Sequence, residues 1–346
     1  MLPNWLYGKS RSKLQEILGG GGGGGTSYTA GDGIDISSGV ISFDPETTPA
    51  IDPSKIDGLD DDLAALAPKT AISNPNILHN PWFTVNQRGI TSVTESHKYI
   101  ADRWRTYTTL ATFEVSRDSN GCIVIDNTFG SEGIALYQKR TTTYLNSLVG
   151  RKLTASVLLS DGTIYSGTAV FDGTNRTNYY ENDSLILYAP AISNYQILCV
   201  AVKPGASVTI KALKLEVGEI STLHLDSRPE YALELAKCQR YFQRIQSTVS
   251  GQAVNLTIGS AVTSSQVILP LPITPMRATP TLTHSSVTIK SAQTGSSVTP
   301  TAIGINTAGT NCIMLYCSSS AGNITVGSPW YLQVAPSGYI DLNAEI

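Results

Sequence analysis

Four carboxylates in the central segment of the chain could do acid–base chemistry if the fold brought two of them together. They are Asp161, Asp172, Glu181 and Asp183. Glycosidases use two such groups, about 5 Å apart in retaining enzymes and about 6.5–9.5 Å apart in inverting ones. Acidic side chains also collect in the turns between strands, because they hydrogen-bond to the turn backbone. A polysaccharide-cleaving enzyme therefore remains an alternative that the sequence does not favour.

Other catalytic and metal-binding patterns are missing from the sequence. The four histidines form no His-Glu-x-x-His motif, no Gly-x-Ser-x-Gly elbow is present, and the five cysteines form no Cys-x-x-Cys pair. The glycine run 19–25 meets the dinucleotide-binding pattern only trivially, since no strand precedes it and no helix follows it. We expect no metal site, no cofactor and free thiols, as in a protein made in a reducing cytosol.

The loop 174–183 carries the residue types that bind sugars. Tyrosine packs on the apolar face of a pyranose ring, while amide and guanidinium groups hydrogen-bond to its hydroxyls. The candidate residues in this loop are Asn175, Arg176, Asn178, Tyr179 and Tyr180. Trp330 and Tyr331 are a second candidate surface, with a hydrophobic core or a trimer interface as the alternative. Trp82 and Trp104 could also stack on sugars, but we expect both in the core.

Composition limits the possible partners. The chain has 346 residues, 15% of them charged, and a formal net charge of -3. Without a basic excess it cannot neutralise phosphates, so nucleic acid is not expected as a partner. No apolar run reaches the roughly 20 residues that span a bilayer, so we expect no membrane insertion, and the N-terminus does not resemble a signal peptide. The length predicts several folded units.

The sequence of the N-terminal part predicts an anchor, a tether and a shaft. Residues 1–18 combine an aromatic cluster with a short amphipathic helix that needs a larger partner for stability, through Trp5, Leu6, Tyr7, Leu14, Ile17 and Leu18. Residues 19–25 are all glycine and predict a flexible tether. Residues 26–73 predict very short strands around Ile34 and Ile41, followed by a helix with a heptad seam at Ile56, Leu59, Leu63 and Leu66. Such short elements favour a trimer, in which three copies bury one another's apolar residues.

The rest of the chain predicts a mainly β structure. Residues 74–225 hold alternating apolar and polar runs between turn residues, which indicates an antiparallel sandwich, with a jelly roll as its expected form. Residues 226–248 predict a connecting helix capped by Asp226, and residues 249–346 predict a second β-sandwich. The helix has a heptad seam that faces either a partner or a sheet of its own chain, formed by Tyr231, Leu235, Cys238, Phe242 and Ile245.

Several motifs resemble a known group of proteins. The central segment contains Asn80-Pro-Trp-Phe-Thr-Val-Asn-Gln-Arg-Gly, Ala101-Asp-Arg-Trp, Leu136-Tyr-Gln-Lys and Ile210-Lys-Ala-Leu-Lys-Leu-Glu-Val-Gly. Together they resemble the jelly-roll modules of phage tail proteins, which look like carbohydrate-binding modules. The segment Lys237-Cys-Gln-Arg-Tyr-Phe-Gln resembles one found just before the distal domain of phage tail fibres, which implies a junction between domains. The pattern from Leu271-Pro-Ile-Thr-Pro onward and the ending Leu342-Asn-Ala-Glu-Ile resemble the C-terminal head domains of phage fibres, and residues 28–43 look like fibre shaft repeats.

The resemblance implies a homotrimeric virion fibre that is assembled in the host cytoplasm. Its N-terminus would bind other tail, neck or baseplate proteins, and its distal domains would attach to a host-surface glycan. Two alternatives stay open: a tailspike that degrades polysaccharide, and a neck or head fibre with a purely structural role. We expect an adhesive protein, not an enzyme.

Overall fold

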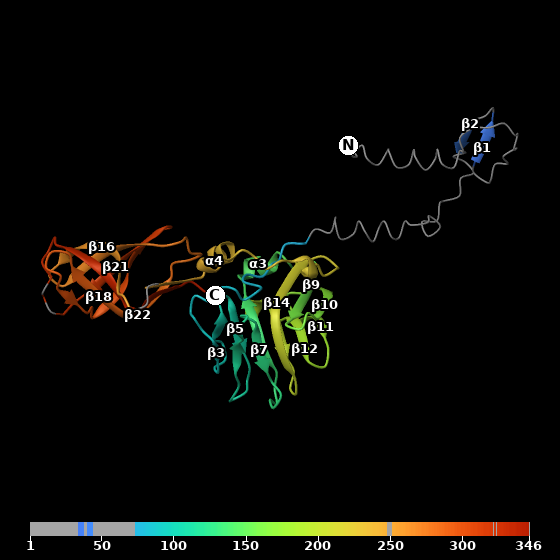
Figure 1. The fold of residues 1–346 in the computed structure, drawn as a ribbon, viewed down its shortest axis with the longest axis horizontal. Coiled ribbons are helices and arrows are strands. Elements are labelled where there is room, and N and C mark those ends of the chain that lie inside the picture. The colour runs from blue at the N-terminus through green and yellow to red at the C-terminus, as the bar shows by residue number, and fades with distance from the viewer. Residues whose placement is uncertain are drawn as a thin grey trace. The chain divides into compact units, whose positions relative to one another are not determined.

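The computed structural model describes residues 34–37, 40–43, 73–247, 251–320, 322 and 324–345 (Figure 1). The chain divides into two units, Met1–Ala71 and Ile72–Ile346. In the first unit, β1 (Ile34–Ser37) and β2 (Val40–Phe43) form an antiparallel hairpin, which confirms the expected short strands. The predicted anchor, the glycine tether and the heptad seam of residues 56–66 lie outside the described residues.

The second unit begins with an antiparallel sandwich of two six-stranded sheets. We name each sheet after one of its inner strands. The β14 sheet has the order β10 (Ile164–Val170), β9 (Lys152–Leu159), β14 (Ser207–Val217), β7 (Ile123–Asp126), β6 (Val115–Arg117) and β3 (Ser92–Val93). The β8 sheet has the order β11 (Thr177–Glu181), β12 (Leu185–Ala189), β13 (Gln196–Val202), β8 (Ile134–Lys139), β5 (Trp104–Tyr107) and β4 (Tyr99–Ala101).

The core of the sandwich lies between these sheets and is formed by apolar side chains from both of them. Trp104, Leu136 and Leu198 of the β8 sheet pack in one cluster with Ile210 and Leu213 of the β14 sheet. This confirms an antiparallel β-sandwich in the central segment. Three short helical elements interrupt or follow the strands: α3 (Thr142–Asn146), η2 (Ile192–Asn194) and η3 (Leu223–Leu225).

The predicted connecting helix is much shorter than expected. Helix α4 (Tyr231–Gln239) begins after Glu230, and β15 (Phe242–Gln246) follows it as a strand. Asp226 does not cap the helix; its carboxylate instead accepts a hydrogen bond from Lys214 Nζ at 2.7 Å. Lys214 is fully buried, so its charge requires this partner.

The continuous heptad seam is therefore wrong. Tyr231 is 53% exposed, Leu235 is partly buried, and Cys238 is buried within the chain itself. Phe242 and Ile245 lie on β15, where they pair with Asn343 and Ile340 of β22 (Pro329–Asn343). Pairing with β22 competes with continuation of the helix, and in this segment the strand pairing is the more stable arrangement.

The C-terminal domain is one curled antiparallel sheet. Its strands follow the order β19 (Ser297–Val298), β18 (Thr281–Ser291), β22, β16 (Val254–Thr263), β17 (Gln266–Pro272), β21 (Cys312–Ser318) and β20 (Ala302–Ala308), with β15 also paired to β22. Ile289 of β18 and Leu315 of β21 are fully buried in one core, although three strands (β22, β16 and β17) lie between β18 and β21 in the sheet. A single sheet achieves this only by folding over itself, so the domain is sandwich-like without having two separate sheets.

Candidate functional site

The loop before β3 presents Trp82 at the surface of the sandwich. Its geometry depends on Asn80, whose side chain is fully buried. The Asn80 amide donates to the carbonyls of Val85 (2.8 Å) and Asp102 (2.9 Å), and its Oδ1 accepts from the Val85 N–H (3.0 Å). The indole N–H of Trp104 donates to the Asn80 carbonyl at 2.9 Å. Three buried hydrogen bonds of one side chain thus fix the course of the loop.

This loop sends its two aromatic residues in opposite directions. Phe83 is fully buried in the core and contacts the Trp104 ring edge to face, with centroids 5.6 Å apart. Trp82 remains partly exposed, and the Leu213 N–H donates to the Pro81 carbonyl at 2.9 Å, which ties the loop to β14. The expectation of a buried Trp is confirmed for Trp104 and wrong for Trp82, because the tight turn at Asn80–Phe83 points adjacent side chains apart.

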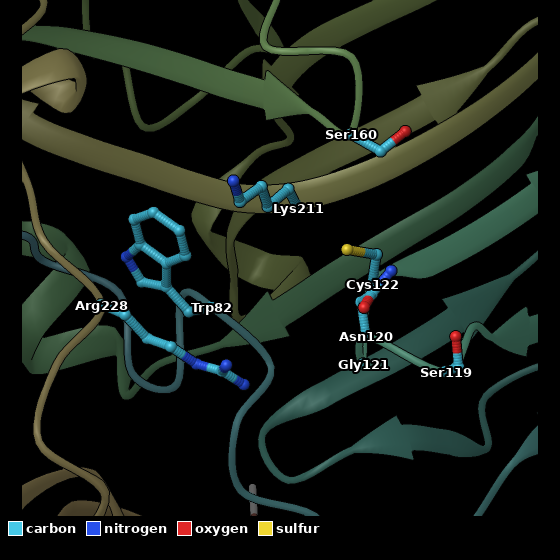
Figure 2. Close-up of a pocket in the computed structure, with 8 residues that line it drawn as sticks. All are labelled: Trp82, Ser119, Asn120, Gly121, Cys122, Ser160, Lys211 and Arg228. Carbon is cyan, nitrogen blue, oxygen red and sulfur yellow. The ribbon is translucent and has the colours of Figure 1, made fainter.

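Trp82 forms one wall of a pocket of about 590 Å³ on the sandwich (Figure 2). The pocket is built from five separated segments of the chain, which meet only in the folded sandwich. It is lined by Trp82, Ser119, Asn120, Gly121, Cys122, Ser160, Lys211 and Arg228. Its volume lies within the range of about 300–1,000 Å³ that is usual for small-molecule sites.

Lys211 reaches the pocket because β14 contains a bulge. Ile210 pairs with Leu159 and Ala212 with Leu158, so Lys211 is the extra residue without a partner on β9. A bulge redirects the side chain of the extra residue out of the regular alternation. Lys211 is exposed, and its Nζ lies 6.0 Å from the centroid of the Trp82 ring.

The turn between β6 and β7 forms the facing wall (Figure 2). The Asp118 carboxylate accepts the backbone N–H groups of Asn120 at 2.9 Å and Cys122 at 2.8 Å, which closes the turn. Behind it, Arg117 donates to the Phe83 carbonyl at 2.8 Å and thereby joins the turn to the Trp82 loop. The pocket is thus framed by two loops that are tied to each other.

Cys122 offers no reactive thiolate in this pocket. Burial raises the pKa of its thiol, and the nearby Asp118 carboxylate raises it further. The thiol therefore stays protonated at neutral pH and is a poor nucleophile. The polar lining atoms can donate and accept hydrogen bonds, and the indole can stack on an apolar ring face, which is the chemistry of saccharide binding.

The structure separates the residues of the predicted sugar-binding loop. Tyr179 points into the core, where its hydroxyl has no hydrogen-bond partner among the described residues and burial raises its pKa. Tyr180 stacks on Tyr165 with centroids 5.3 Å apart. Asn175 is exposed and donates to the Asp172 carboxylate at 2.9 Å. The five residues therefore do not form one site.

Arg176 and Asn178 contribute instead to the outer face of the β8 sheet. Arg176 donates to Asn178 Oδ1 at 2.8 Å, and its guanidinium lies 3.6 Å from the centroid of the Tyr188 ring. Arg176 and Tyr188 line a shallow groove of about 370 Å³, together with Tyr107, Ala135 and Ala201. Since the guanidinium covers one face of Tyr188, that ring is less available for stacking than Trp82.

The second predicted surface is largely internal. Trp330 is 2% exposed in the core of the C-terminal domain, and its indole N–H donates to Ser328 Oγ at 2.9 Å. It cannot meet a ligand there, so its assignment to a binding surface is wrong and the core alternative holds. Tyr331 is partly buried on the opposite face of β22, between Ile258 of β16 and Lys290 of β18.

The four carboxylates considered for glycosidase chemistry have local roles. The Thr163 backbone N–H lowers the pKa of Asp161, and Lys203 lowers the pKa of Glu181. Hydrogen bonds from Thr174 and Asn175 lower the pKa of Asp172 to about 2. A general acid requires a raised pKa, so these three are poor proton donors. Asp183 is exposed next to the turn that follows β11.

The described part of the chain contains neither a candidate metal site nor a membrane-spanning helix. Within residues 73–247 and the described C-terminal segments, no group of three His, Cys, Asp or Glu side chains is arranged to hold a metal ion. Among the described helices, none is both long and apolar enough to cross a membrane.

The sequence did not reveal the polar residues around Trp82. Lys211 depends on a bulge, and Arg228 lies in the segment that was expected to be the first turn of the connecting helix. Asn120 lies in an ordinary-looking Asp-Ser-Asn-Gly turn. The motif that contains Trp82 was the one available signal, and it indicated a jelly-roll fold more strongly than a binding site.

Comparison with known proteins does not assign the chain to a family. No known family matches the chain, and no curated protein matches it. Among solved structures, a mutant of the oxalate decarboxylase OxdC from Bacillus subtilis aligns over 76% of this chain and 78% of its own, with 6% identity and a TM-score of 0.11. A TM-score this low carries no argument about fold or activity.

Proposed function

We propose that this chain is a bacteriophage tail fibre that attaches the virion to a glycan on the host cell surface. The observation that carries the adhesive part is the pocket at Trp82, where a partly exposed indole faces hydroxyl, amide and cationic side chains. The virion location rests on the sequence resemblance and on the order of anchor, tether, shaft and β-domains. The central sandwich is in this proposal a jelly roll of the carbohydrate-binding type.

Stacking on Trp82 supplies the apolar part of the recognition. An indole presents a large flat surface that a sugar ring can cover, and it loses little conformational freedom when it does so. Ser119, Asn120 and Ser160 have no side-chain hydrogen bonds to other described residues, so their polar groups are free to bind sugar hydroxyls. Catalysis is not part of the proposal, since the lining contains no carboxylate and no activated nucleophile.

The test measures binding of the purified full chain to a panel of bacterial capsular and O-antigen polysaccharides by biolayer interferometry. We expect at least one polysaccharide to bind, and Trp82→Ala to weaken that binding about tenfold or more, because the stacking surface is lost. Trp82→Phe should retain part of the affinity. Tyr107→Ala, in the groove of the opposite sheet, is the matched control and should bind like the wild type.

Two results would contradict this assignment. If no polysaccharide bound, the chain would not be a glycan adhesin. If Tyr107→Ala abolished binding and Trp82→Ala did not, the adhesive surface would be the groove of the β8 sheet.

The proposal includes a homotrimer held by the N-terminal shaft. Weak sugar sites become useful when three copies bind one polymer together, because the later contacts are intramolecular. Light scattering of the full chain should give three times the chain mass of 36.9 kDa. A monomer mass at micromolar concentration would remove the trimer from the proposal, without affecting the pocket.

A further inference from the structure

The pocket at Trp82 has an unusual charge for this molecule. Its lining contains two cations, Lys211 and Arg228, and no carboxylate. Many other basic residues of the sandwich have an acidic partner, as in Arg88–Asp102 at 3.0 Å. In the described part of the chain, neither Lys211 nor Arg228 forms a salt bridge. Two unpaired cations therefore converge on one concave surface.

We propose that this pocket selects acidic saccharides, with the sugar ring on Trp82 and its carboxylate between Lys211 and Arg228. The inference rests on the proposed glycan adhesion and names the class of sugar that the site prefers. The ligand class is a polysaccharide that contains uronic or nonulosonic acid residues.

The positions of the two cations suit a carboxylate on a stacked ring. Lys211 Nζ lies 6.0 Å from the Trp82 centroid, so a substituent at the edge of a stacked sugar comes next to the ammonium group. Figure 2 shows Arg228 extending past Trp82 toward the turn that holds Gly121 and Cys122. A guanidinium there can bind a carboxylate through two parallel hydrogen bonds.

The nearby Asp118 carboxylate does not neutralise the positive charge of Lys211 and Arg228. The Asp118 carboxylate is engaged with the backbone N–H groups of Asn120 and Cys122, and it does not line the pocket. The Cys122 thiol is protonated and contributes no charge, because burial raises its pKa. The pocket therefore presents its two positive charges to a ligand without a competing internal anion.

A third cation supports the wall from behind. Arg117 lies against the turn, since a Cβ atom added to Gly121 would meet its guanidinium at 3.2 Å. Its Nη2 donates to the Phe83 carbonyl, while its Nη1 is buried without a hydrogen-bond partner among the described residues. This guanidinium adds to the positive potential of the pocket while it holds the Trp82 loop in place.

The experiment compares acidic polymers with their own neutral forms. Hyaluronan, polygalacturonate, alginate and polysialic acid are each tested before and after chemical reduction of their carboxyl groups, against the full-length chain. We expect binding to at least one acidic polymer, and at least a tenfold loss of affinity when its carboxyl groups are reduced.

Variants locate the effect in the pocket. Lys211→Gln and Arg228→Gln should each weaken binding to the acidic polymer about tenfold, and leave binding to its reduced form unchanged. Raising the salt concentration should weaken the wild-type complex more than that of the double variant. The matched control is Lys152→Gln, an exposed lysine on β9 that lies outside the pocket and should have no effect.

The outcomes separate this inference from the proposed function. Equal binding to acidic and reduced polymers, or binding of the full chain to neutral glycans alone, would overturn the charge selection and leave the adhesion standing. Loss of binding to both forms in Trp82→Ala, with charge selection in the wild type, supports both. Absence of binding to every glycan, acidic or neutral, would overturn both.

Discussion

At the scale of single residues, the three described tryptophans show how much a residue type can predict. Trp104 and Trp330 are buried in the cores of the two β-domains, while Trp82 is partly exposed at the edge of a pocket. Sequence alone does not distinguish them, because all three stand in runs that mix apolar and polar residues. The difference comes from buried hydrogen bonds, such as those that join Asn80 to Val85 and Asp102, and these cannot be read from residue types.

The Asn80 side chain gives the first prediction. Asn80→Ala leaves the Val85 N–H and two buried carbonyls without their partner, so we expect the free energy of unfolding to fall by about 3 kcal/mol. Urea unfolding of the full chain measures this. Asn175→Ala, an exposed asparagine, should change stability by less than about 0.5 kcal/mol. Equal stability of the two variants would show that Asn80 does not hold the loop.

His79 gives a pH-dependent prediction. Burial, and next the charge of Arg140, lower the pKa of His79 to about 2, so the folded protein keeps this ring neutral. The unfolded chain binds a proton near pH 6.5, which favours unfolding as the pH falls below that value. The contribution of His79 to stability should therefore decline by about 1.4 kcal/mol per pH unit below pH 6.5.

Unfolding at several pH values checks the sign. His79→Gln should remove this part of the pH dependence, so that the stability difference between variant and wild type shrinks or reverses between pH 6.5 and 5. His284→Gln, at an exposed position, is the control and should keep the wild-type slope. A His79→Gln profile parallel to the wild type would contradict a neutral His79 ring in the folded protein.

At the scale of elements, the sequence pattern predicted the strands well, and the heptad pattern of residues 231–245 failed. In β9, apolar Leu153, Ala155 and Val157 alternate with polar Thr154 and Ser156, so a period of two is visible in the sequence even though the two polar side chains are buried as well. The segment 226–248 has apolar residues at helical spacing, yet only Tyr231–Gln239 is helical. Arg244 forms a two-point salt bridge with Asp341, and such tertiary contacts cannot be read from local spacing.

The pocket was harder to predict than the fold for the same reason. Its lining comes from loops and from the bulge at Lys211, and these depend on register between strands far apart in sequence. The predicted loop contributed Arg176 to a different groove, while Tyr179 is buried in the core. The residue types of the loop suggested sugar binding, but which side chains lie together could be seen only in the structure.

At the scale of the whole molecule, the last residues of the chain connect the two β-domains. The Glu345 carboxylate forms a salt bridge with Arg103, whose side chain is 1% exposed, and lies 3.8 Å from Arg88. The Arg103 guanidinium also lies 3.5 Å from the centroid of the Tyr241 ring, between α4 and β15. Charged side chains of the sandwich are thus neutralised by the C-terminal segment.

We expect this ion pair to couple the stabilities of the two β-domains. Glu345→Gln leaves the buried charge of Arg103 unpaired, which should cost about 3 kcal/mol. We expect calorimetry of the wild type to show one joint transition for the two β-domains, and the variant to show two. Glu219→Gln removes an exposed partner of Lys152 and should cost less than about 1 kcal/mol. Separate transitions in the wild type would contradict the coupling.

We have proposed that Trp82 and its neighbours bind a glycan. A crystal structure of the full chain with its tightest-binding oligosaccharide would test this binding site directly. We expect a sugar ring stacked on the Trp82 indole, with an acidic group held by Lys211 and Arg228. A sugar bound in the groove between Tyr107 and Tyr188, or on the C-terminal domain with the Trp82 pocket empty, would contradict it.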